Sequence, residues 1–176
     1  RPWEIIAITF TNKAAGELKD RLAARLGPEA EGVWASTFHS ACVRVLRRDI
    51  DRLGFAKDFT IYDTDDSRRV VKDVLKELNL DDKTFPPKNV LSVISAAKDR
   101  YLGPEEFAQK HQAETDWRMA RIAKIYAAYQ KKLASASALD FDDIIFHTVS
   151  LLRQEPEVLD YYQRKFRYVL VDEYQD

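Results

Sequence analysis

The chain has 176 residues, of which 45% are hydrophobic and 32% charged, with 28 lysines and arginines against 29 aspartates and glutamates. This length is enough to bury a core. The balanced charge excludes a polybasic nucleic-acid tail, and the hydrophobic content excludes a disordered segment. The single cysteine, Cys42, excludes a disulfide-built secreted fold and fits a reducing, cytoplasmic compartment. No run of about 18 apolar residues occurs, so no membrane-spanning helix is expected.

The first predicted element is a buried strand. Residues 5–10 (IIAITF) form a continuous apolar run rich in β-branched residues, which is typical of a strand covered on both faces of a parallel sheet. Thr11 and Asn12 then offer N-cap chemistry, and leucines at every fourth position predict a helix that ends at Gly27. Gly16 lies inside this helix, where it costs about 1 kcal/mol relative to alanine.

Strand-like and helix-like patterns continue to alternate beyond this first helix. Residues 33–38 predict a second strand, and the apolar spacing from about Ser40 to Gly54 predicts a second helix. Residues 59–62 predict a short third strand. This order of elements indicates an α/β fold.

The pattern changes after Asp63. Helical spacings of apolar residues and no strand signal are found up to Leu133, so this region is expected to be an all-helical insertion whose tyrosines and tryptophans form a core. The small residues 134–138 (ASASA) predict a hinge or linker. Residues 140–153 again predict a helix, and residues 168–171 predict a final strand.

Two adjacent carboxylates, Asp172 and Glu173, follow this final strand. Ligands of open α/β sheets bind at the carboxyl ends of the strands. One carboxylate could hold Mg²⁺ and the other could orient or deprotonate an attacking water, as phosphoryl transfer to water requires. Side chains alternate along a strand, so the two carboxylates are expected to point in different directions. From the dipeptide alone, the plainer interpretation is that the acidic residues begin a loop.

Aromatic and polar residues also follow the first two predicted strands. They are Phe10, Thr11 and Asn12 after the first strand, and Thr37, Phe38 and His39 after the second. An aromatic ring there can stack on a base of single-stranded nucleic acid, and polar groups beside a helix N-terminus can bind phosphate oxygens. Taken by themselves, Phe10 more simply predicts a core residue, Asn12 a plain N-cap and His39 a structural histidine. In the helical region, Lys98 and Arg100 could equally contact duplex phosphates or form a solvated face.

Five stretches of the chain resemble motifs of the UvrD/Rep/PcrA group of superfamily 1 helicases, and within it the PcrA type. Residues 169–176 (VLVDEYQD) resemble the Walker B motif, residues 8–15 (ITFTNKAA) motif Ia, and residues 36–40 (STFHS) the motif after it. Residues 139–144 (LDFDDI) resemble the LDFDDL segment that leads back into the ATPase lobe. Residues 94–99 (ISAAKD) resemble the ISxAKN stretch of the helical insertion, with a final aspartate instead of asparagine.

The resemblance implies a fold made of two parts. One is a partial RecA-like P-loop NTPase lobe with a parallel sheet, called lobe 1A, which residues 1–63 and 138–176 would form. The other is an all-helical insertion, lobe 1B, which residues 64–137 would form. The partners implied are single-stranded DNA, junctions of single- and double-stranded DNA, and repair or replication proteins.

The resemblance also assigns roles to individual residues. Asp172 would help to hold Mg²⁺, Glu173 would activate water at the γ-phosphate of ATP, and Gln175 would sense the nucleotide. The residues implied to bind DNA are Phe10, Thr11, Asn12, Thr37, Phe38 and His39. ATP and Mg²⁺ are therefore the implied cofactors.

No G-x-x-x-x-G-K-[ST] phosphate-binding loop occurs among the five glycines. In the family this loop precedes motif Ia and a second RecA-like lobe follows the Walker B motif, so the chain is expected to be a fragment of a 3′–5′ DNA helicase. The fragment alone should hydrolyse no ATP, and its sheet should have an unpaired strand edge.

Two alternatives stay open. The first is a non-catalytic module that binds DNA or protein, although such a module would not need the Asp172-Glu173 pair. The second is part of a helicase–nuclease subunit, which shares these motifs. A P-loop phosphotransferase of another kind would explain Asp172 but not the motifs around Phe10 and His39.

Overall fold

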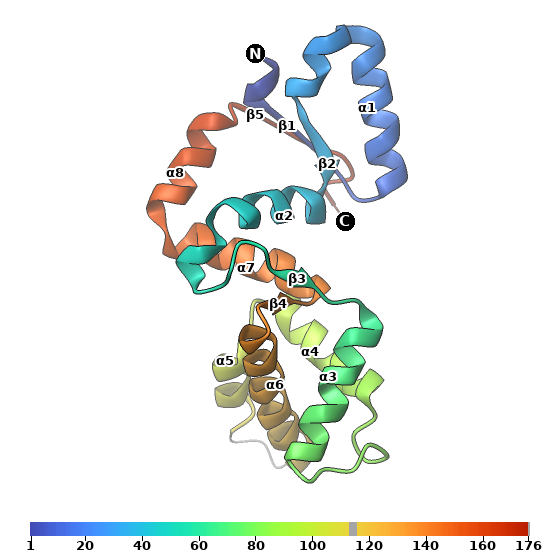
Figure 1. Cartoon of the computed structure of the whole chain (residues 1–176), viewed down its shortest axis with the longest axis vertical. Helices are drawn as coiled ribbons and strands as arrows, with labels where there is room; N and C mark the ends of the chain where they lie inside the picture. The colour runs from blue at the N-terminus through green and yellow to red at the C-terminus, as the bar shows by residue number, and fades with distance from the viewer. Residues whose placement is uncertain (113–115, 176) are drawn as a thin grey trace. The chain divides into compact units, whose positions relative to one another are not determined.

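The chain forms two compact units in the computed structural model, which describes residues 1–112 and 116–175 (Figure 1). Residues 1–57 and 147–176 form the first, here called the sheet unit, and residues 58–146 form the second, the helical unit. Asp176, the last residue of the stretch that resembles Walker B, lies outside the described residues. None of the described helices is long and apolar enough to cross a membrane.

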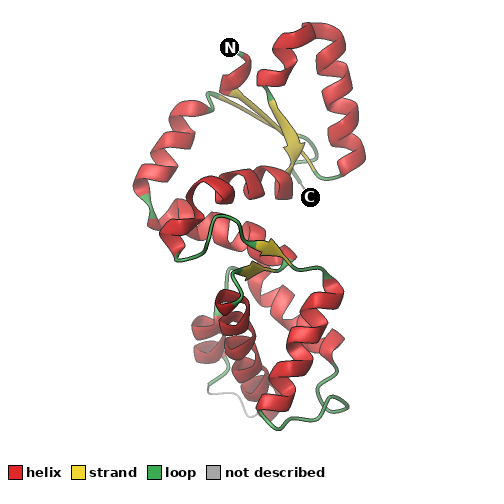
Figure 2. Ribbon diagram, viewed as in Figure 1, coloured by secondary structure: helices red, strands yellow, loops and turns green. Residues whose placement is uncertain are grey.

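A three-stranded parallel sheet organises the sheet unit (Figure 2). β1 (Ile5–Thr9) lies between β2 (Trp34–Thr37) and β5 (Tyr168–Val171). The α/β prediction and the parallel sheet are confirmed, with each strand within one residue of its expected ends. In β1, Ala7 and Ile8 are buried, as expected of a central strand.

Helices flank these strands in the chain. α1 (Asn12–Leu26) follows β1, α2 (Phe38–Asp49) follows β2, and α8 (Pro156–Lys165) precedes β5. Short 3-10 helices cover Pro2–Glu4 (η1), Gly27–Gly32 (η2) and Ile50–Leu53 (η3). α8 is absent from the sequence prediction, although a proline at the first helical position, as at Pro156, is a common helix-start signal.

Among its described residues, the helical unit contains four complete helices and the first turns of a fifth. These are α3 (Thr64–Glu77), α4 (Pro87–Asp99), α5 (Pro104–Lys110), α6 (Trp117–Ser135) and the start of α7 (Phe141–Gln154). Their apolar faces enclose a core in which Val71, Val74, Ile125 and Tyr129 are fully buried. No strand occurs within described residues 64–133, as predicted.

A two-stranded parallel ladder closes the helical unit. β3 (Thr60–Ile61) pairs with β4 (Ala138–Leu139), and both β4 residues are buried. The prediction of a hinge over residues 134–138 is therefore wrong, because α6 extends to Ser135 and Ala138 belongs to the core. The ladder also draws the flanking residues into the helical unit, so the compact units divide the chain at other residues than the predicted lobes do.

The aromatic residues of the helical unit only partly follow the expectation of a core. Tyr126 and Tyr129 are buried with 1% or less of their surface exposed. Trp117 is 58% exposed, so the prediction is wrong for this residue. It is the first residue of α6, where it contacts Phe85 edge-on with ring centroids 5.9 Å apart.

Replacing Gly16 with alanine should raise the free energy of unfolding by about 0.5–1 kcal/mol. Gly16 lies inside α1, and a Cβ atom built there meets nothing within 4 Å. Gly54→Ala is the matched control, because Gly54 follows η3 with a φ of +87°, a conformation that disfavours a side chain. Urea unfolding should show stabilisation by the first substitution and destabilisation by the second. Changes in the free energy of unfolding that have the same sign for both substitutions would contradict this account.

Candidate functional site

The carboxyl ends of the three main strands meet at one edge of the sheet. Thr9 at the end of β1 is in register with Thr37 at the end of β2. On the other side, Ile8 is in register with Val171, and the backbone N–H of Asp172 donates to the Ile8 carbonyl at 3.0 Å. This carboxyl edge therefore brings together all three sets of predicted site residues, although they come from opposite ends of the chain.

An aromatic pair lies at this carboxyl edge. The rings of Phe10 and Phe38 are 5.1 Å apart between centroids and inclined by 51°. Phe10 is 41% exposed, so the alternative that it is a core residue is wrong. A half-exposed ring pair at a strand end offers a platform on which planar groups can stack.

Threonines start both helices beside this aromatic pair. The Thr11 side chain accepts a hydrogen bond from the Ala14 N–H at 3.1 Å, and the Thr37 side chain accepts one from the Ser40 N–H at 3.2 Å. Thr11, and not Asn12, is thus the N-cap of α1. Asn12 is exposed on the first turn of α1. His39 is half-buried on the first turn of α2.

The candidate catalytic residues lie in a turn after β5. Asp172, Glu173 and Gln175 are all exposed, and Glu173 has a φ of +52°. Because β5 ends at Val171 and the backbone turns at once, strand alternation does not determine how the two carboxylates point. Their directions are set by this turn.

The carboxylates at this edge fit a Mg²⁺ ion whose other ligands are water and substrate phosphates. Among the described residues, no group of three or more histidine, cysteine or acidic side chains could hold a metal. Mg²⁺ characteristically uses one or two carboxylates together with water and substrate phosphates. The exposed Asp172 carboxylate suits that pattern.

A buried ionic network in the helical unit was missed by the sequence analysis. The Lys98 ammonium lies 2.7 Å from Asp140 Oδ2 and 2.9 Å from Asp143 Oδ1, and its side chain is 1% exposed. The Tyr129 hydroxyl donates to Asp140 at 2.8 Å, and the Gln130 amide donates to Asp143 at 3.2 Å. Both predictions for Lys98, a phosphate contact or a solvated face, are therefore wrong.

The same two carboxylates begin α7. The N–H of Asp143 donates to the Asp140 side chain at 2.9 Å, and the N–H of Asp140 donates to the Asp143 side chain at 3.1 Å. This reciprocal cap satisfies two backbone donors that a helix start leaves open. Burial alone would raise the pKa of Asp140, but the Lys98 charge and the hydrogen bonds outweigh it and hold this pKa below its ordinary value.

A spacing signal for this network exists in the sequence. Val90, Ile94 and Lys98 follow one another at intervals of four residues on α4, so the lysine falls on the apolar stripe. A lysine on a buried stripe needs an acidic partner. The sequence alone does not say which carboxylate supplies it.

A parallel sheet followed by aromatic, hydroxyl and acidic side chains along its carboxyl edge places the chain in the α/β class with an open sheet, in which ligands generally bind at that edge. The whole chain, residues 1–176, matches the model of the UvrD/REP helicase N-terminal domain. The chain belongs to this family.

Similar proteins are ATP-dependent DNA helicases named PcrA. The chain is 53% identical to PcrA of Bacillus subtilis (strain 168) over 175 residues. This aligned region covers 99% of this chain and 23% of that protein. It is 50% identical to PcrA of Staphylococcus aureus (strain Mu50) and of Staphylococcus epidermidis, over 99% of this chain and 24% of each relative. The chain thus spans about a quarter of the length of these relatives.

Proposed function

We propose that this chain is the DNA-gripping part of an ATP-dependent DNA helicase that moves 3′ to 5′ along single-stranded DNA and opens duplexes at junctions. The observation that carries the proposal is the meeting of the Phe10–Phe38 pair and the Asp172-Glu173 pair at one carboxyl edge. The family and the names of the relatives support it. A reducing, cytoplasmic location, in which the free Cys42 stays a thiol, is part of the proposal.

The two compact units receive separate parts in this proposal. The sheet unit corresponds to part of the RecA-like lobe 1A, and the helical unit to the insertion 1B. The phosphate-binding loop is expected in the part of the whole protein outside these 176 residues, so the chain by itself should not turn over ATP.

The acidic pair would divide the chemistry of hydrolysis. Asp172 would hold Mg²⁺, which neutralises charge on the phosphates of ATP when bound. The Glu173 carboxylate would orient a water molecule and accept its proton. Gln175, two residues further in the same turn, would sense the γ-phosphate and relay its loss to the carboxyl edge.

The aromatic pair would bind the DNA strand. A base would stack on the exposed Phe10 ring, which packs against Phe38. The Thr11 hydroxyl, the Asn12 amide and the His39 ring would receive neighbouring phosphates at the two helix starts. Thr37 is buried and donates its hydroxyl to Ser40 Oγ at 3.0 Å, so it would act by capping α2 and not by direct contact with a phosphate. Both helices begin at the edge that also carries Asp172. A structural change that follows ATP hydrolysis would therefore be transmitted to the bound DNA over a short distance.

Replacing Phe10 with alanine in the whole protein should weaken binding of single-stranded DNA about 5- to 150-fold, the range for removal of one base stack. Fluorescence anisotropy with labelled oligothymidylate measures the affinity. Trp3→Ala is the matched control, since Trp3 is 54% exposed but precedes β1, at the amino end of the sheet. Equal affinities of the Phe10 variant and the wild type would overturn the proposed DNA site.

A further inference from the structure

An exposed row of polar side chains runs along α2 away from the carboxyl edge. Ser40, Arg44 and Arg48 follow one another at intervals of four residues, and all three are exposed. Four residues advance about 6 Å along one face of a helix. The row therefore begins within the first turn of α2, beside the aromatic pair, and continues for a further two turns.

Both arginines of this row lie on aromatic rings from other elements. The guanidinium carbon of Arg44 is 3.9 Å from the centroid of the Trp34 ring, and that of Arg48 is 3.6 Å from the Tyr161 ring. Lys165 joins them, with its ammonium 5.4 Å from the Trp34 ring. Stacking fixes the position of a guanidinium while its N–H groups can still bind a ligand at the edge.

This stacked-arginine surface, formed by Arg44, Arg48 and Lys165 on their rings, carries excess positive charge. Arg48 pairs with Asp49 at 2.8 Å. Across residues 1–112 and 116–175, neither Arg44 nor Lys165 has a carboxylate within 4.0 Å. Of the three cations, only Arg48 has a carboxylate partner among the described residues. The remaining positive charge favours an anionic ligand.

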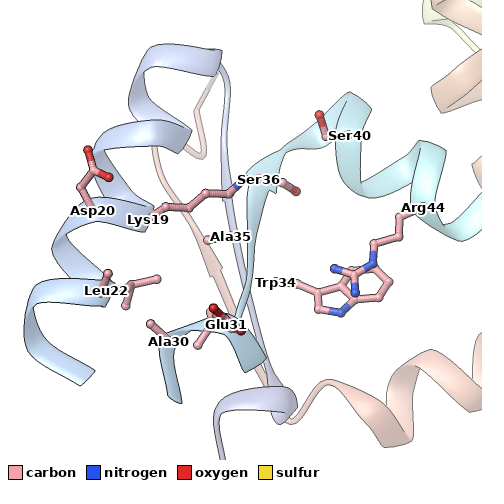
Figure 3. Close-up of a pocket in the computed structure, with 12 residues that line it drawn as sticks. Lys19, Asp20, Leu22, Ala30, Glu31, Trp34, Ala35, Ser36, Ser40 and Arg44 are labelled. Atoms are coloured by element: carbon pink, nitrogen blue, oxygen red, sulfur yellow. The ribbon is translucent and has the colours of Figure 1, made fainter. Parts of the chain in front are cut away.

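A cavity of about 560 Å³ lies beside Arg44, between α1, β2 and α2 (Figure 3). Its lining includes the Ser36 and Ser40 hydroxyls and, from α1, Lys19, whose side chain points toward Ser36 in Figure 3. Asp20 and Glu31 also line it, but Asp20 points away from the strand. An anion in this cavity would lie beside Lys19, Ser40 and Arg44, with the Glu31 carboxylate as the opposing charge.

We propose that the stacked-arginine surface binds the phosphodiester backbone of a single DNA strand where that strand continues beyond the Phe10–Phe38 pair. Planar guanidinium groups match phosphate oxygens two at a time. The row starts at the aromatic pair, so one strand can contact both. This inference rests on the proposed function and extends its DNA path by contacts that read no sequence.

The test compares short and long oligothymidylate in the whole protein. Arg44→Ala should weaken binding of the long oligomer, which extends from the aromatic pair to the stacked-arginine surface, about fivefold. The affinity for the short oligomer, which covers the aromatic pair only, should stay within about twofold of the wild-type value. The slope of log affinity against log salt for the long oligomer should decrease by about 0.7 for each phosphate that the variant no longer neutralises. Arg25→Ala is the matched control, since Arg25 is an exposed arginine in the last turn of α1.

The outcomes separate this inference from the proposed function. If Phe10→Ala weakens binding and Arg44→Ala changes neither the affinity nor the salt slope, the stacked-arginine surface is not on the DNA path. If the Phe10 substitution also has no effect, the proposed function itself fails. An effect of Arg44→Ala equal to that of Arg25→Ala would indicate general charge attraction and would likewise overturn the inference. Unchanged circular dichroism spectra and thermal midpoints exclude misfolding as the cause.

Discussion

Replacing Lys98 with methionine should lower the free energy of unfolding of this chain by about 3–5 kcal/mol at neutral pH. The single ammonium pairs with both buried carboxylates, those of Asp140 and Asp143, at 2.7 and 2.9 Å, and compensates one of their two negative charges. Methionine fills a similar volume but leaves both negative charges without a cation in a buried site. Urea unfolding followed by circular dichroism measures the loss.

The pH dependence of this loss has a definite sign. In the wild type the pKa of Asp140 is lowered in the folded state, so its contribution is present at neutral pH and is lost as the pH falls through the lowered pKa. In the variant, burial acts on Asp140 without the opposing Lys98 charge, so the pKa of Asp140 should rise. The penalty is then relieved on acidification, and the difference between the two proteins should be smaller at about pH 5 than at about pH 7.

A second lysine of the helical unit provides the control. Lys132 pairs with Glu77 at 2.6 Å, but these side chains are 34% and 59% exposed. Lys132→Met should therefore change the free energy of unfolding by less than about 1 kcal/mol. Similar losses for the two lysine variants, or a Lys98 loss that grows on acidification, would contradict the buried-charge account.

Replacing Glu173 with glutamine in the whole protein should lower DNA-stimulated ATP hydrolysis about 10²- to 10⁴-fold, the range for one general base. The amide keeps the size of the side chain but cannot accept a proton from water. Affinities for ATP and for single-stranded DNA should stay within about twofold, because Asp172 and the aromatic pair are untouched. Phosphate release and equilibrium binding measure the two effects separately.

The control for this substitution is Glu157→Gln, which makes the same change at an 83% exposed residue that pairs with Arg52 at 3.2 Å. Its turnover should equal that of the wild type. If the Glu173 variant keeps wild-type turnover, Glu173 is not the base. A loss of ATP affinity in place of turnover would instead assign this residue to nucleotide binding.

Much of the sheet could be predicted because its strands have distinctive local patterns. Residues 5–10 and 168–171 are continuous apolar runs, which are typical of strands in a parallel sheet, and the sheet order places the two strands next to each other. The start of the helix after β1 could be predicted from local chemistry as well, since a threonine cap acts within three residues. The helix after β2 begins at Phe38, capped by Thr37, and so before its expected start near Ser40. The clustering of these residues at one edge follows from the common direction of the strands.

Features that depend on distant partners could not be predicted in this way. Lys98 pairs with Asp140 and Asp143, which lie at the start of another helix. A lysine on an apolar stripe indicates that an acidic partner is needed, but it does not indicate which residue that partner is. The stack of Arg44 on Trp34 depends on where a strand and a helix meet. Likewise, the 134–138 stretch has a linker-like composition, yet the pairing of β3 with β4 buries its last residue.

The pairing of β1 with β5 has a consequence for how the protein is made. Ile5 in β1 pairs with Tyr168 in β5. Because β5 leaves the ribosome after the whole helical unit has been synthesised, β1 stays unpaired on this side until then. Pairing across so long a loop is slow, while contacts between neighbouring helices within residues 58–146 are more local and form quickly. We therefore expect the helical unit to form first during synthesis. The strand that leads to Asp172 and Glu173 would be placed last.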